Sequence, residues 1–253
     1  MEIVQLPVLD DNYIYLIHEP ETGETVVVDP ALALPVLDTL GNSGWRLKYI
    51  LNTHQHWDHV GGNLEIKAAT GCQIIASEFD RNRIPGIDIA VAEGHTIELG
   101  KHKAQVIFTP GHTSGHVAYH FADDELLFCG DTLFVMGCGR LFEGNAEQLW
   151  HSLQKLKCLP EATRIYCTHE YTQNNGRFAL NLEPENQALQ LKMAAVDQLR
   201  AKQHPTVPST IAEELATNPF FREDSLSLQQ TIKMAGRKPI DVFTEIRKLK
   251  DRF

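Results

Sequence analysis

The chain has 253 residues, a formal net charge of -10 and 43% hydrophobic residues, which suits an ordinary globular protein of one large domain or a domain with a smaller partner. The acidic charge disfavours binding to nucleic acid or to an anionic membrane, and no apolar stretch reaches the roughly 20 residues of a membrane span. Residues 1–7 lack the basic segment and apolar core of a secretory signal, and the five cysteines are odd in number and scattered. We therefore predict a cytoplasmic protein.

Short apolar runs alternate with helical patterns as far as about residue 170. This mixture of strand pairs and helices predicts two packed sheets covered by helices. Strands are expected at 14–17, 25–28, 47–52, 73–75, 95–99, 104–108, 117–121, 125–129 and 164–167, and helices at 33–41, 63–70 and 146–157.

After residue 171 the β-rich segments disappear and helical spacing dominates. The sequence predicts helices at 186–203, at 210–216 with Ser209 as its cap, and at 239–250. A further helix is expected to start at Asp224 or Ser225 and to end at Gly236.

Residues 53–59 read Thr-His-Gln-His-Trp-Asp-His, which places four metal-binding side chains within six positions. In an extended segment His54 and His56 project to the same side, because side chains alternate along a strand. Asp58 and His59 can point into a second pocket after the chain turns, and the glycine pair that follows is expected to allow a tight turn into the next helix. This spacing suits two neighbouring metal ions better than one.

Three further donors each follow an expected strand: His112, Asp131 and His169. Taken singly, such a histidine or aspartate is more often a surface, hydrogen-bonded or turn-forming residue. Four strand-end segments that each deliver His or Asp are what a site for two metals in an α/β protein needs. The donors together therefore predict such a site.

The pattern Thr-His-x-His-x-Asp-His, followed by Gly-His-Thr, Gly-Asp-Thr and a late histidine, resembles the metallo-β-lactamase superfamily. Within it, the segments 138–144, 169–172, 205–210, 218–220 and 250–253 resemble glyoxalase II, the hydroxyacylglutathione hydrolases. The resemblance implies an α/β (α+β) fold, a metallo-β-lactamase-like αββα sandwich of two mixed sheets flanked by helices, with a C-terminal all-α domain. It implies a catalytic domain at 1–169 and a glutathione-binding domain at 170–253.

The resemblance also implies the metal ligands. His54, His56 and His112 would hold one metal, Asp58, His59 and His169 the other, and Asp131 would bridge both. Zinc is the expected metal, with iron or manganese as alternatives, because nitrogen- and oxygen-rich sites accept each of them. Two ions about 3.5–4 Å apart can generate a shared hydroxide that attacks a thioester carbonyl. Asp58 and Asp131 would be catalytic residues that orient this hydroxide.

The substrate that the resemblance implies is S-D-lactoylglutathione, hydrolysed to glutathione and D-lactate in the second step of methylglyoxal detoxification. A small molecule is therefore the expected partner, and a monomer the expected form. Arg140 and Phe142 stand where some family members carry Lys and Tyr, so we expect weaker substrate binding at Phe142, which lacks the hydroxyl. The family's substrate contacts fall on Arg140, Phe142, Tyr171, Asn175, Phe178, Arg247 and Lys250.

Other functions share parts of this pattern. A lactonase or β-lactamase could use the same metals, but an antibiotic-hydrolysing enzyme is normally exported and does not need the glutathione-matching tail. A glutathione persulfide dioxygenase would not need the full second-metal set or the extended helical domain. A non-catalytic metal-binding module is disfavoured because all seven ligand positions are present.

Overall fold

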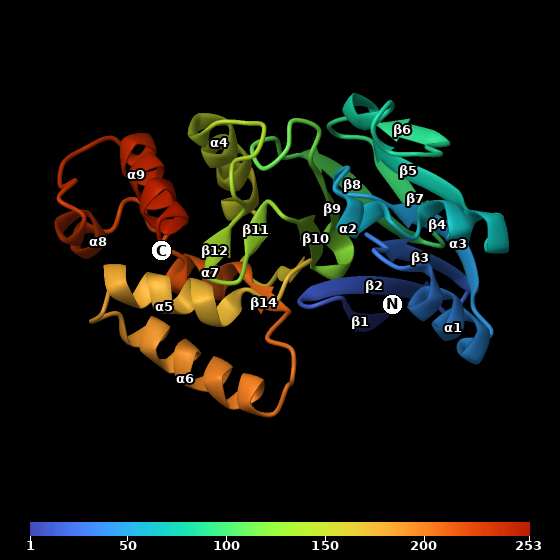
Figure 1. The fold of residues 1–253 in the computed structure, drawn as a ribbon, viewed down its shortest axis with the longest axis horizontal. Coiled ribbons are helices and arrows are strands. Elements are labelled where there is room, and N and C mark those ends of the chain that lie inside the picture. The colour runs from blue at the N-terminus through green and yellow to red at the C-terminus, as the bar shows by residue number, and fades with distance from the viewer. The chain divides into compact units, whose positions relative to one another are not determined.

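The computed structural model describes residues 1–253, which divide into two compact units. The first unit comprises Met1–Phe108 and Ser114–Gly130, and the second comprises Thr109–Thr113 and Asp131–Phe253. Figure 1 labels the helices and strands of both. None of the helices combines the length and the apolar composition that crossing a membrane requires.

The first unit contains a six-stranded sheet in the order β1-β2-β3-β4-β5-β6 (Figure 1). Its first three strands pair antiparallel and the following pairs are parallel, so the sheet is mixed. Four further strands pair antiparallel in the order β10-β9-β8-β7. The strands are β1 (Glu2–Val8), β2 (Asn12–Glu19), β3 (Glu24–Val28), β4 (Arg46–Leu51), β5 (Gln73–Ser77), β6 (Ile89–Val91), β7 (Thr96–Leu99), β8 (His102–Phe108), β9 (Val117–Phe121) and β10 (Leu126–Gly130).

Side chains from the two sets of strands meet inside the first unit. The buried Tyr119 of β9 donates its hydroxyl hydrogen to the backbone oxygen of Asn52, which follows β4, at 2.7 Å. Tyr15 of β2 meets the ring of Phe128 of β10 edge to face, with centroids 5.5 Å apart. The two sheets therefore pack face to face, as the sequence predicts.

Helices cover the other face of the mixed sheet. Val36 and Leu40 from α1 (Ala33–Ser43) and Ile66 from α3 (Asn63–Thr70) share one apolar cluster with Leu16 and Ile50 of the strands. All eight residues of β2 are buried, because its two faces are covered by different layers. This packing holds the carboxyl ends of β3 and β4 in fixed positions. The short helices of this unit are α2 (Trp57–Val60), η1 (Glu78–Asp80) and η2 (Ala122–Asp124).

The glycine pair after the histidine cluster serves a different purpose from the predicted one. Gly61 and Gly62 have φ values of -58° and -85°, which any residue can adopt. A Cβ atom on Gly61 would lie 2.5 Å from the oxygen of Ala31, and one on Gly62 would lie 2.8 Å from the carbonyl carbon of Leu32. The prediction of a glycine-dependent turn is wrong, because the glycines instead let the backbone of residues 30–33 approach closely.

The second unit is mainly helical, with two short strand pairs. Strand β11 pairs antiparallel with β12, and β13 pairs antiparallel with β14. Helices α5 and α6 run side by side (Figure 1). The elements are β11 (Leu133–Phe134), β12 (Gly137–Cys138), α4 (Ala146–Lys157), β13 (Arg164–Cys167), α5 (Thr172–Leu182), α6 (Gln187–Ala201), β14 (Ser209–Thr210), α7 (Ile211–Thr217), α8 (Leu226–Thr231) and α9 (Pro239–Asp251).

Two predicted helix boundaries in this unit are wrong. Thr210, not Ser209, caps α7, because the Thr210 hydroxyl accepts from the backbone N–H of Glu213. Ser209 lies in β14, and its hydroxyl oxygen lies 2.8 Å from a carboxylate oxygen of Glu213 and 2.5 Å from one of Glu214. Helix α8 begins after its cap Ser225 as predicted but ends at Thr231 instead of at the predicted glycine.

Candidate metal and substrate site

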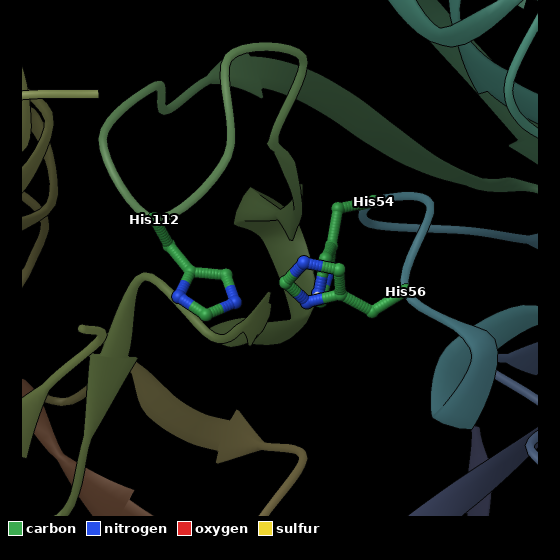
Figure 2. Close-up of side chains that lie close together, drawn as sticks. All are labelled: His54, His56 and His112. Atoms are coloured by element: carbon green, nitrogen blue, oxygen red, sulfur yellow. The ribbon is translucent and has the colours of Figure 1, made fainter. Parts of the chain in front are cut away.

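The first unit brings four predicted metal donors together around α2. His54 and His56 lie in the loop between β4 and α2, and their rings project to the same side, as Figure 2 shows. The Nε2 atom of His54 lies 3.0 Å from Nδ1 of His56. Asp58 and His59 follow in α2, with Oδ2 of Asp58 3.6 Å from Nε2 of His59. These four side chains place three imidazole nitrogens and a carboxylate in one small region.

Asp29, which directly follows β3, sets the orientation of two of these histidines. Its buried carboxylate accepts hydrogen bonds from the Thr53 hydroxyl at 2.6 Å and from Nδ1 of His59 at 3.0 Å. Since the Thr53 hydroxyl donates to Asp29, its oxygen accepts from Nδ1 of His54, which is 3.0 Å away. In both histidines Nδ1 therefore carries the hydrogen, and Nε2 presents a lone pair for a metal.

Asp29 and Asn12 were not predicted from the sequence. The side-chain amide of Asn12 donates to Oδ2 of Asp58 at 3.0 Å. Asp29 follows a strand in the same way as Asp131, which is a signal that the sequence does carry. Its φ of 47° lies in the left-handed region that a non-glycine residue rarely adopts. The strained backbone is maintained by the buried hydrogen bonds of its carboxylate.

The second unit brings three further predicted donors together. His112 lies in the loop between β8 and β9, and its Nδ1 donates to the backbone oxygen of Arg140 at 2.7 Å. Oδ2 of Asp131 lies 3.5 Å from Nε2 of His112 and also 3.5 Å from Nε2 of His169. These separations are too long for strong hydrogen bonds. They suit a carboxylate oxygen that two cations would share.

The donor set fits divalent metals. Across the two units it consists of five imidazoles and two carboxylates, a set that accepts zinc, iron or manganese. Burial raises the pKa of the Cys138 thiol to about 11 and that of Cys167 to about 12, and neither thiol belongs to a cluster of side chains that could hold a metal ion. Nitrogen and oxygen donors, rather than sulfur, define the chemistry of the site.

A cavity of about 410 Å³ lies in the second unit beside His112 and Asp131. Six of the seven predicted substrate contacts line it, whereas Phe178 is buried with 3% of its surface exposed. Asn174, which the sequence analysis did not single out, also lines the cavity. The lining residues are His112, Asp131, Phe134, Cys138, Arg140, Phe142, Tyr171, Asn174, Asn175, Arg247 and Lys250.

The aromatic wall of the cavity is built around His169. The ring of Tyr171 stacks on that of His169 with centroids 4.8 Å apart and planes 2° from parallel. Phe134 meets both rings edge to face. Asn175 donates its side-chain amide to the backbone oxygen of Val135, so this predicted substrate contact also holds the β11–β12 turn. Aromatic contacts and a hydrogen bond therefore hold this wall next to His169, a predicted metal donor.

The two predicted cations on α9 have different surroundings. The guanidinium of the buried Arg247 donates to the backbone oxygens of Cys138 and Gly139 and to the carboxylate of Asp251. Lys250 is less buried, and its ammonium contacts the side-chain oxygen of Asn174. Burial, assisted by the positive charge of Arg247, lowers the pKa of Lys250 to about 8.

Two family models together match nearly the whole chain. Residues 8–169 match the metallo-β-lactamase superfamily, and residues 170–253 match the hydroxyacylglutathione hydrolase C-terminus. A hydroxyacylglutathione hydrolase of Methylococcus capsulatus is 55% identical over 253 residues, which is 100% of this chain and 99% of that protein. The chain belongs to the hydroxyacylglutathione hydrolase family.

Further comparisons agree with this membership. The hydroxyacylglutathione hydrolase of Rhodospirillum rubrum is 53% identical over 100% of this chain and 99% of its own length. The crystal structure of ETHE1 from Myxococcus xanthus superposes with a TM-score of 0.71 at 26% identity, covering 98% of this chain and 90% of that one. The crystal structure of TTHA1623 in a di-iron-bound form superposes with a TM-score of 0.62 at 24% identity, covering 87% of this chain and 100% of that one. At this identity the likeness supports only the fold. The predicted glyoxalase II family and its metallo-β-lactamase-like fold are confirmed.

Proposed function

We propose that this hydroxyacylglutathione hydrolase family member converts S-D-lactoylglutathione and related 2-hydroxyacylglutathiones, with water, to glutathione and the free hydroxy acid. One observation supports this most directly: metal donors and cationic side chains line the same cavity. His112 and Asp131 lie on its wall together with Arg140 and Lys250. An anionic thioester substrate needs metal donors for the reaction and cationic side chains for binding. The uncharged substrate of a lactonase needs only the metal donors.

For the metals we propose two divalent cations, with zinc as the preferred metal. The first is assigned to His54, His56 and His112, the second to Asp58, His59 and His169, and Asp131 is shared. When bound, such cations lower the pKa of water and polarise a carbonyl oxygen. The Nδ1 hydrogen bonds of His54, His59 and His112 support this assignment, because each leaves the opposite ring nitrogen available as a ligand.

The protein's own residues orient and enclose the reacting groups. Asp29 keeps two imidazoles in the tautomer that can bind a metal, and Asn12 restrains the Asp58 carboxylate. With cations bound, Asp58 and Asp131 would partly neutralise their charge, and each carboxylate could accept a hydrogen bond from water. Tyr171 and Phe142 supply aromatic surface around the thioester and limit the access of bulk water.

For the glutathione moiety we propose that Arg140 and Lys250 provide positive charge at the cavity. Glutathione carries two carboxylates and one ammonium group, so an acidic protein must bind this net anion with locally placed cations. Arg247 adds charge, and it also braces the wall at residues 138–139 through its hydrogen bonds. Asn175 supports the same wall, and Phe178 lies beneath Lys250.

We propose the corresponding division of labour along the chain, with residues 1–169 carrying the metal chemistry and residues 170–253 binding glutathione. A small molecule is the proposed partner, and a cytoplasmic monomer is the proposed form. None of the five cysteines forms a disulfide bond, which suits a reducing compartment.

The direct test is to incubate the purified protein with S-D-lactoylglutathione and to measure thioester loss, thiol release and oxygen uptake together. We expect one thiol per thioester, no oxygen consumption, and loss of activity after chelation that added zinc restores. Oxygen uptake in place of thioester loss would indicate a persulfide dioxygenase. Turnover that survives complete removal of metal would contradict the proposal.

A further inference from the structure

The ammonium group of Lys250 lies against two aromatic rings beside the cavity. Its Nζ atom is 5.3 Å from the ring centroid of Phe178 and 5.0 Å from that of Phe253. The two rings meet edge to face, with centroids 5.5 Å apart. Asn174 completes the surroundings with its side-chain oxygen and its backbone oxygen. We call Phe178, Phe253 and Asn174 the lysine cradle.

The two rings of the lysine cradle differ in burial. Phe178 is 3% exposed, and its ring stacks with that of Phe220 with centroids 6.5 Å apart. Packing in the interior of the unit therefore explains its position. Phe253 is 52% exposed, and its backbone N–H donates to the oxygen of Lys250 at 3.3 Å. Hydrophobic burial alone does not explain why the half-exposed Phe253 ring lies over the Lys250 ammonium. The attraction between a cation and the face of an aromatic ring explains this position.

The positive charges near Lys250 mean that its ammonium group needs contacts that hold it beside the cavity. The groups that act on Lys250 are Arg247 on the same helix, Arg140 on the loop after β12, and Cys138 in β12. The two arginines repel the ammonium, and the nearby carboxylate of Asp251 on the same helix is engaged by both arginines. A long flexible lysine side chain would relieve this repulsion by extending into water. The ring faces and the Asn174 oxygens oppose that movement.

We propose that Phe253, together with Phe178, positions the Lys250 ammonium at the cavity so that it binds the glycyl carboxylate of a glutathione conjugate. The identity of the ligand rests on the proposed function. Phe253 is then a positioning residue, since it acts through Lys250 and does not itself touch the reacting thioester.

The test measures binding of S-methylglutathione, a thioether that cannot be hydrolysed, to the metal-loaded protein by calorimetry. Phe253→Leu is expected to raise the Kd about 2- to 5-fold, in line with loss of one partly exposed cation–π contact. The Kd for the analogue whose glycyl carboxylate is an amide should not change. Phe253→Trp should restore tight binding, because indole is the better cation–π partner. Equal losses for both ligands, or no loss for either, would overturn the proposal.

Two matched controls separate this effect from general ones. Phe79→Leu removes another exposed ring with a cation–π contact, to Arg83 in the first unit, and should leave both Kd values unchanged. Lys248→Ala removes an exposed charge of α9 and should have much less effect than Lys250→Ala. If either control matched its test variant, the lysine cradle would have no specific role.

The pH dependence provides a second measurement. Because the pKa of Lys250 is lowered to about 8, its positive charge is lost as the pH rises through 8, well below the usual range for lysine. Binding of S-methylglutathione should therefore weaken more between pH 7 and about 9 in the wild type than in Lys250→Ala. Identical profiles would exclude Lys250 as the carboxylate partner. Both measurements follow binding alone, so thioester hydrolysis could fail while the proposal holds.

Discussion

Asp29 shows how one buried carboxylate can orient the histidines of the proposed metal site. It fixes the tautomers of His54 and His59 through hydrogen bonds to Thr53 and to the His59 ring. Oδ2 of Asp29 accepts from the Thr53 hydroxyl and from the His59 ring, while Oδ1 accepts from the backbone N–H of Thr53 at 2.8 Å. An amide in its place would turn its donating nitrogen toward one of these donors, so it cannot satisfy all three. At the scale of single residues, the ligand set therefore depends on a residue outside it.

Asp29→Asn is expected to weaken metal binding about 10- to 100-fold, the usual cost of removing an outer partner of a metal ligand. Competition with a chromophoric chelator measures this affinity directly. Asp38→Asn, an exposed change of the same type on α1, is the control and should leave the affinity unaltered. Unchanged affinity in Asp29→Asn would show that the tautomers are set by other means.

Asp131→Ala should have a larger effect than Asp29→Asn, because the Asp131 carboxylate lies equidistant from two imidazole nitrogens. We expect loss of most bound metal and a fall in kcat/KM beyond about 100-fold. Metal content by elemental analysis and thioester turnover are to be measured on the same sample. A variant that keeps two metals and normal turnover would exclude a shared role for this carboxylate.

The proposed metal donors could be picked out from the sequence because each follows an expected strand, four of them within one short motif. Asp29 also follows a strand, but the roles of Asp29 and Asn12 depend on partners that lie 30 and 46 positions further along the chain. The sequence also does not show that the Arg247 guanidinium donates hydrogen bonds to the backbone oxygens of Cys138 and Gly139 in the cavity wall. Hydrogen bonds between distant segments are a property of the folded chain.

At the scale of elements, the β11–β12 turn depends on helices that follow it. Glu214 of α7 is fully buried, and its carboxylate accepts from the backbone N–H of Met136 at 2.7 Å. The same carboxylate pairs with Lys192 of α6 at 2.8 Å. Met136 has a φ of 55°, so the turn is strained and needs these contacts. The turn carries the cavity wall that Asn175 and Arg247 also hold.

Glu214→Gln is expected to lower the free energy of unfolding by about 3–5 kcal/mol, because it leaves the Lys192 charge without its buried partner. Glu213→Gln is the matched control, since Glu213 faces the same lysine at 3.3 Å but is 54% exposed. It should cost at most about 1 kcal/mol. Denaturant unfolding measures the free energy of unfolding of both variants. Equal losses would show that the buried Glu214–Lys192 pair contributes no more to stability than the exposed Glu213–Lys192 pair.

Long elements with clear periodicity could be predicted well, such as α3, α4 and β9, whose observed bounds equal the expected ones. Helix α5 was not predicted, because its first turns contain two Asn and a Gly, which are poor helix formers. Packing on α6 supplies the stability that the local sequence lacks. Strand β1 was also missed, since Pro7 argues against a strand but is tolerated at the edge of a sheet.

At the scale of the whole molecule, the family models assign residues 8–169 to the superfamily and 170–253 to the hydroxyacylglutathione hydrolase C-terminus. Each compact unit contains some of the proposed metal donors, four in the first and three in the second. The cations proposed to bind glutathione all belong to the second unit. The proposed activity therefore requires the complete chain, rather than the metal-binding motif alone.

The central claim is that these seven donors hold two cations that make thioester hydrolysis possible. Titrating zinc into the chelated protein, while following the rate of S-D-lactoylglutathione hydrolysis and the bound metal per chain, tests it most directly. The rate should rise from near zero and saturate at two equivalents of bound metal. Full activity without metal, or saturation at a single equivalent, would contradict it.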